Sequence, residues 1–181
     1  METSDKFEFS RPIAIDVLDD GDNQFDISAD DEERQALARR FDILSIERLE
    51  ASLRLVPGMG GIRINLHGTV TADIHQACVI TLKPVSATIE ATFERAFGPQ
   101  DSYAPGAEIM ISPDEDDPPD PIYSGTIDVG EVVAEELSLE LNPFPRSADA
   151  AFDGYSSGGD GQGIDEPIEG PFARLADLKK K

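Results

Sequence analysis

Three runs in the middle of the chain alternate apolar and polar residues, and this pattern constrains the fold more than any other feature. The runs cover residues 48–55, 62–75 and 85–97, and in each of them most of the alternate side chains are apolar. A period of two places alternate side chains on opposite faces of a β-strand, so each run predicts a strand with one buried face. Because short links join the runs, we expect an antiparallel meander, with a bend in its second strand at Gly68.

Two helices are predicted around this meander. Before it, Asp30 and Glu33 have the spacing of a capping box, and the apolar residues that follow share one face. After it, Asp128 and Glu131 repeat the capping pattern ahead of a helix with a buried apolar stripe and an acidic outer side. The expected fold class is therefore α+β: an antiparallel β-meander with one helix before it and one acidic helix after it, a flexible acidic loop and a C-terminal tail.

The segment that precedes the first helix is expected to be extended. Residues 7–17 carry an apolar alternation, and Pro12 favours an edge strand or a strand pair. A turn over residues 19–23 then returns the chain to a short strand around Phe25 and Ile27.

The length of 181 residues fits one ordinary domain with tails, and we place that domain at residues 5–150. Within it, residues 98–121 are rich in proline and acidic side chains, which predicts a mobile loop. Residues 151–170 are glycine-rich and predict a disordered linker. Residues 171–181 form a short amphipathic segment that ends in three lysines.

The charge of the chain excludes one class of function. With 37 acidic and 15 basic side chains, the net charge is −22. Affinity for nucleic acid comes largely from Lys and Arg that displace counterions from phosphates, so a protein that coats nucleic acid with a basic surface is excluded. Residues 96–145 hold twelve acidic residues and no Lys or Arg. The glutamates of the second helix form either a docking face for a basic partner or its solvated side, and they are Glu131, Glu135, Glu136 and Glu140.

A single cysteine, Cys78, excludes an intrachain disulfide. Together with an acidic N-terminus that lacks a signal region, it points to a reducing cytoplasm, and no stretch approaches the length of a membrane span. His75 stands three residues before Cys78, but structural zinc needs four ligands and the sequence has no second cysteine. We expect no metal and no cofactor, and a packed Cys78 that lies neither at a helix N-terminus nor among cations that would lower its pKa.

Three stretches follow one another in a set order along the chain. The first joins residues 64–72 to 76–85 and contains Cys78; the second is the helix block at 127–139; the third is the Pro-Phe-Ala-Arg-Leu tail within 171–179. Taken together, they resemble the YceD family of large ribosomal RNA subunit accumulation proteins, and the tail is typical of its members with one cysteine. The resemblance implies a role in accumulation of large-subunit ribosomal RNA, with no established enzymatic activity.

The resemblance does not imply a metal site in this chain. Many members carry a second signature cysteine where this sequence has His75, and further cysteines near the end of the helix block. Residues 142–148 contain none.

These observations predict a non-enzymatic accessory factor in large ribosomal subunit biogenesis, whose acidic loop and helix hold a basic ribosomal protein or assembly factor. One alternative is direct RNA contact through the arginine-rich stretch from Arg34 to Arg63, above all Arg34, Arg39 and Arg40. A lower-ranked alternative is an RNA-processing enzyme that holds Mg²⁺ with clustered carboxylates. It ranks lower because the carboxylates lie mainly in a loop and on one helix face.

Overall fold

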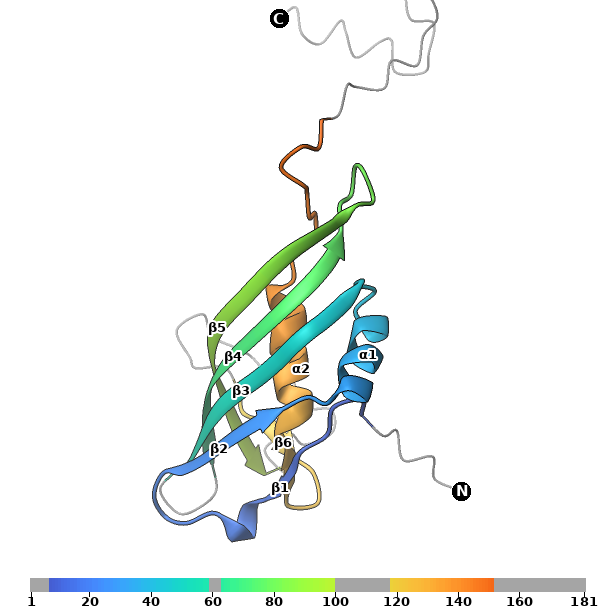
Figure 1. Ribbon diagram of the computed structural model, residues 1–181. Helices are drawn as coiled ribbons and strands as arrows, with labels where there is room; N and C mark the ends of the chain where they lie inside the picture. The colour runs from blue at the N-terminus through green and yellow to red at the C-terminus, as the bar shows by residue number, and fades with distance from the viewer. Residues whose placement is uncertain (1–6, 59–62, 100–117, 152–181) are drawn as a thin grey trace, which may run out of the picture. The chain divides into compact units, whose positions relative to one another are not determined.

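The computed structural model describes residues 7–58, 63–99 and 118–151. It confirms the α+β class: a five-stranded sheet packs one face against two helices (Figure 1). The elements, in chain order, are β1 (Pro12–Ala14), a short 3-10 helix η1 (Ile15–Val17), β2 (Asn23–Ser28), α1 (Asp31–Arg40), β3 (Ser45–Pro57), β4 (Ile64–Ala77), β5 (Pro84–Pro99), β6 (Asp120–Ile122), β7 (Thr126–Asp128) and α2 (Val129–Glu140).

The sheet is a meander with one addition. Strands β2, β3, β4 and β5 pair in chain order and antiparallel, as the alternation predicted, and the short β6 then joins the end of β5 in parallel. Strands β1 and β7 form a separate two-stranded antiparallel sheet. On β4 every second residue is buried, so one face of the long strands lies in the core and the other faces water.

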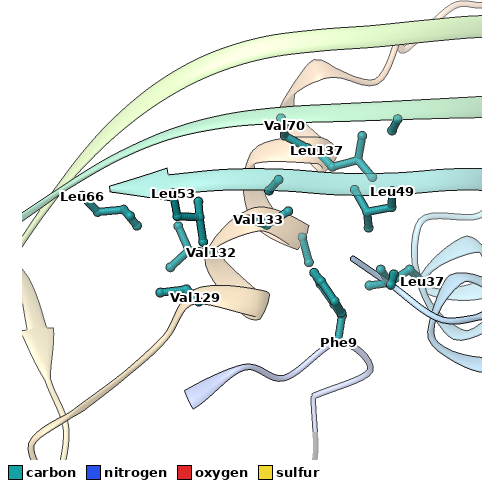
Figure 2. Close-up of a cluster of buried hydrophobic side chains, with 14 of the residues drawn as sticks. Phe9, Leu37, Leu49, Leu53, Leu66, Val70, Val129, Val132, Val133 and Leu137 are labelled. Atoms are coloured by element: carbon teal, nitrogen blue, oxygen red, sulfur yellow. The ribbon is translucent and has the colours of Figure 1, made fainter. Parts of the chain in front are cut away.

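The core lies between the inner face of the sheet, the two helices and the N-terminal segment. Phe9 comes from that segment and is fully buried beside residues of both helices (Figure 2). The labelled members of this cluster are Phe9, Leu37, Leu49, Leu53, Leu66, Val70, Val129, Val132, Val133 and Leu137.

Gly68, where the sequence predicts a bend, makes close contact with the neighbouring strand β5. The pairing of β4 continues through Gly68 on both sides, opposite Leu53 on β3 and Phe93 on β5. A Cβ at this position would lie 2.2 Å from the Phe93 ring. The glycine therefore makes room for an aromatic side chain on the neighbouring strand.

The N-terminal segment crosses the start of α2. Asp128 accepts hydrogen bonds from the Ser10 hydroxyl at 2.6 Å and from the Arg11 backbone N–H at 2.7 Å, and it also caps the first turn of α2. The predicted extended segment is shorter than expected, because Ile15–Val17 forms the 3-10 turn η1. Only β1 pairs as a strand in this part of the chain.

The loop predicted over residues 98–121 is shorter in the structure than in the prediction, because strands occupy both of its ends. Gly98 pairs with Pro121, because β5 continues to Pro99 and β6 begins at Asp120. The central part of that loop, at 100–117, and the predicted segments at 152–170 and 171–181 lie outside the described residues.

Replacing Gly130 by alanine tests the contact between α2 and the N-terminal segment. A Cβ there would lie 2.4 Å from the Phe9 carbonyl oxygen and 2.9 Å from the Arg11 nitrogen. We expect Gly130→Ala to lower the free energy of unfolding by about 2 to 4 kcal/mol, although alanine favours a helix by about 1 kcal/mol. Chemical denaturation measures this change. Gly21→Ala is the matched control, since nothing lies within 4 Å of its Cβ, and it should change stability by less than about 0.5 kcal/mol.

Candidate functional site

Glu131, the first glutamate of α2, binds an arginine from a distant part of the chain. Arg40 lies in the last turn of α1. Its two terminal guanidinium nitrogens, Nη1 and Nη2, donate to the Glu131 carboxylate at 2.8 and 2.6 Å. Arg40 also reaches Glu8 at 3.1 Å. The predicted capping box at Asp128 is therefore only half formed, because the Glu131 carboxylate binds Arg40, whereas the box at α1 is complete.

Arg95 places a second cation beside α2. It stands on β5 at a position where the strand's alternation turns side chains toward the helices. Its guanidinium donates to Glu136 at 2.7 Å, and to Glu135 and Asp120 at 3.1 Å each. One arginine thus holds three carboxylates, and its side chain is only 26% exposed. This cluster was missed in the sequence, where its signal is a charged residue at an inward position of the alternating run 85–97.

The predicted acidic face of α2 is narrower than expected. The side chains of Glu131 and Glu136 are only 13% and 15% exposed, because the two arginines cover them. Glu135 is 45% exposed and Glu140 is exposed. The sequence around α2 contains no Lys or Arg, but the fold brings Arg40 from α1 and Arg95 from β5 to its glutamates.

The arginines predicted to contact RNA are largely occupied in the same way. Arg34 forms an ion pair with Asp31 and donates to the Ala29 carbonyl, and Arg40 binds Glu131. Arg39 is exposed and forms no ion pair within the described ranges. Ten Lys and Arg side chains fall in these ranges, and seven of them form ion pairs with carboxylates: Arg11, Arg34, Arg40, Arg48, Arg54, Lys83 and Arg95.

Cys78 is fully buried, which confirms the packed cysteine. It begins the turn between β4 and β5, and its sulfur accepts hydrogen bonds at 3.4 Å from the backbone N–H groups of Thr81 and Ser147. The Thr81 side chain and these N–H groups lower the thiol pKa to about 6, against burial, which raises it. Neither a helix N-terminus nor a cation causes this shift of the pKa: the largest cause is the side chain of Thr81, three residues away, and the second is the Ser147 N–H, which comes from a distant segment.

His75 does not share the environment of Cys78. Its ring lies on the outer face of the sheet, 3.1 Å from the Ser45 hydroxyl and 3.7 Å from Glu47. In the part of the chain that the structure describes, His, Cys, Asp and Glu side chains form no group of three or more that could hold a metal ion. The three carboxylates around Arg95 converge on a guanidinium instead.

The outer face of the sheet carries polar pairs. Arg48 binds Asp73 at 2.8 Å, and His67 lies 3.1 Å from Glu94. An open hollow of about 590 Å³ on this face is lined by residues of β2, β3, β4 and β5. The outward face of β4 is therefore polar, as one buried face predicts, and Asp73 and His67 on it pair with residues of neighbouring strands.

The fold and these surfaces define an acidic α+β protein in which most of the Lys and Arg side chains in the described ranges are paired with carboxylates of the same chain. The family model described as large ribosomal RNA subunit accumulation protein YceD matches residues 66–179, which is more than half of the chain. The chain therefore belongs to the YceD family, and the sequence resemblance is confirmed. Membership implies a role in large ribosomal RNA subunit accumulation. No curated protein and no solved structure matches the chain.

No helix among the described residues is long and apolar enough to cross a membrane.

Replacing Arg40 tests the tie between α1 and α2. Arg40→Met keeps most of the apolar stem and leaves the largely covered Glu131 carboxylate without its cation. We expect the free energy of unfolding to fall by about 1 to 2 kcal/mol in chemical denaturation. The neighbouring Arg39→Met should change it by less than about 0.5 kcal/mol. Equal effects of the two substitutions would contradict a structural role for Arg40.

Titrating Cys78 tests its hydrogen-bonded environment. The ultraviolet absorbance of the thiolate should appear with a midpoint near pH 6, with Cys78→Ser as the blank. Thr81→Val should move the midpoint upward, because it removes the largest cause of the shift. The pKa of the folded thiol lies below that of an unfolded thiol, which is about 8.5. The free energy of unfolding should therefore rise between about pH 6 and about pH 8.5. This rise should be absent in Cys78→Ser. A midpoint near the ordinary thiol pKa would exclude the effect.

Proposed function

We propose that this protein is a non-enzymatic accessory factor in large ribosomal subunit biogenesis, and that it acts by binding a basic ribosomal protein or assembly factor. The observation that carries the proposal is the distribution of charge. Of the ten described cations, seven are bound by carboxylates of the same chain, while the chain as a whole has a net charge of −22. A surface of this kind favours a basic partner over phosphate groups.

The exposed carboxylates of α2 support a specific place for the partner. Glu135 and Glu140 are open to solvent, and Glu131 and Glu136 contribute charge to the same helix through their ion pairs. The segment 100–117 adds six acidic residues in the sequence. Since fields of exposed charges reach only about 8 Å at physiological salt, the partner has to approach these groups closely.

Direct RNA contact is the competing hypothesis, and three of the described arginines are available for it. Arg39, Arg63 and Arg146 are exposed and form no ion pair within the described ranges. They lie in different parts of the chain: Arg39 on α1, Arg63 just before β4, and Arg146 in the segment after α2. In our proposal ribosomal RNA is reached through the bound basic protein, and these three arginines are dispensable.

Charge-neutral variants separate the two hypotheses. The full chain is mixed with purified large-subunit ribosomal proteins or with naked large-subunit ribosomal RNA, at low and high salt. We expect Glu135→Gln with Glu140→Gln to weaken capture of the basic proteins, and capture by the native protein to fall as salt rises. The triple variant Arg39→Gln, Arg63→Gln, Arg146→Gln should leave capture unchanged.

The same variants are then compared in cells that lack the native protein. If the glutamate variant restores large-subunit ribosomal RNA levels and the arginine variant does not, the basic-partner proposal is wrong and the protein contacts RNA itself.

A further inference from the structure

One edge of the main sheet is open along most of its length. Strand β5 runs from Pro84 to Pro99, but β6 pairs only with its last three residues, Phe97 to Pro99. Among the described residues no other strand pairs with the outer side of β5, which is the outermost of the long strands in Figure 1. Unpaired N–H and C=O groups at such an edge can pair with another extended chain.

The register identifies the backbone groups that point away from β4. The Cys78 N–H donates to the Lys83 carbonyl at 2.8 Å, and this pair continues the β4–β5 register. Since hydrogen-bonded and non-bonded pairs alternate in an antiparallel ladder, the even-numbered residues of β5 direct their N–H and C=O groups outward. Pro84, which has no N–H, occupies one of these outward positions, where it removes no bond to β4.

The side chains of β5 form two contrasting rows along this edge. On the inner face, Ile89, Ala91 and Phe93 are only half-buried, although the residues opposite them on β4 are fully buried. On the outer face, Glu90 and Glu94 are exposed. Within the described ranges, Glu90 has no cation within ion-pair distance, and Glu94 contacts only the ring of His67. The edge therefore offers apolar surface on one side and negative charge on the other.

The opposite edge of the sheet differs. Strand β2 is only six residues long, and the Arg11 guanidinium donates to its last carbonyl, that of Ser28, at 2.9 Å. Its acidic side chain, Asp26, accepts a hydrogen bond from Ser52 at 2.7 Å. The long, unpaired and acidic edge is that of β5.

We propose that the open edge of β5 binds an extended segment of the basic partner as an additional antiparallel or parallel strand; this deepens the proposed function and rests on it. The added strand carries basic side chains over Glu90 and Glu94, four positions apart, and apolar side chains beside Ala91 and Phe93. Backbone bonds to the outward groups of β5 supply affinity, and the alternating side chains supply selectivity.

A second copy of the chain fits this edge less well. In a twofold antiparallel pair centred on Thr92, Glu90 faces Glu94 of the other copy, and in one centred on Glu90 the two Glu90 side chains face each other. Like charges directly opposite each other destabilise a strand pair. A lysine- or arginine-bearing strand turns the same contacts into attraction.

Hydrogen exchange followed by NMR on the full chain tests the proposal at single amides. The probe is a short peptide in which valines alternate with polar residues, two of them lysines four positions apart. The free protein should exchange rapidly at the amides of Glu90, Thr92 and Glu94 and slowly at those of Ala91 and Phe93, which bond to β4. The lysine peptide should slow exchange at the outward amides, and the same peptide with glutamates should not.

Charge reversal supplies the matched comparison. Glu90→Lys with Glu94→Lys should weaken binding of the lysine peptide roughly tenfold at low salt. The same change of charge on the other strands, Asp26→Lys with Glu50→Lys, should leave it within about twofold. All four side chains are exposed, so both variants should fold.

Several results would overturn the proposal. Slow exchange at the outward amides in the dilute free protein would mean that another part of the chain covers the edge. Protection that grows with protein concentration would mean that a second copy of the chain binds the edge. Equal protection by the glutamate peptide would remove the selectivity for a basic strand. Binding that perturbs only Glu135 and Glu140 would reject the edge and leave the proposed function intact. If the peptide protects the edge while large-subunit ribosomal proteins do not bind, the proposed function fails and the edge site stands.

Discussion

Pairing a few cations with many carboxylates is the constraint on which this structure depends. The chain has 37 acidic and 15 basic side chains, so closing it into one fold brings like charges together. Arg40 joins α1 to α2 through Glu131, and Arg95 joins β5 to α2 and β6 through three carboxylates. Both arginines stand where separate elements meet, which stabilises the helices on the inner face of the sheet.

This use of the arginines also determines what the surface can bind. Cations that hold the fold together are not available to contact phosphate, and the remaining carboxylates are open to basic groups. In our proposal, the negative charge that repels the phosphates of RNA attracts a basic polypeptide before that polypeptide meets ribosomal RNA. A role in large ribosomal RNA subunit accumulation is compatible with such indirect contact.

In our proposal, the open edge of the meander is where the fold binds the basic partner. Long antiparallel strands place charged and apolar rows on opposite faces, and the outermost strand keeps both rows accessible along an unpaired backbone. The half-buried state of Ile89 and Phe93 on β5 follows from their position at the edge, since only the inner strands have a neighbouring strand on both sides along their length. A strand bound there would complete the sheet and gain apolar contact, backbone hydrogen bonds and charge pairs together.

The sequence by itself determined the local structure of this protein. Period-two alternation predicted the three long strands, and Asp30 and Asp128 predicted where the helices begin, because these signals act between residues close in the chain. Only the tertiary structure decided which charges are exposed: Arg40 covers Glu131 from 91 residues away, and Ser147 reaches the sulfur of Cys78 from 69 residues away. No local pattern encodes such contacts, because they form only when packing of the apolar face brings distant elements together. A charged or polar group then loses its water and gains a partner from another part of the chain.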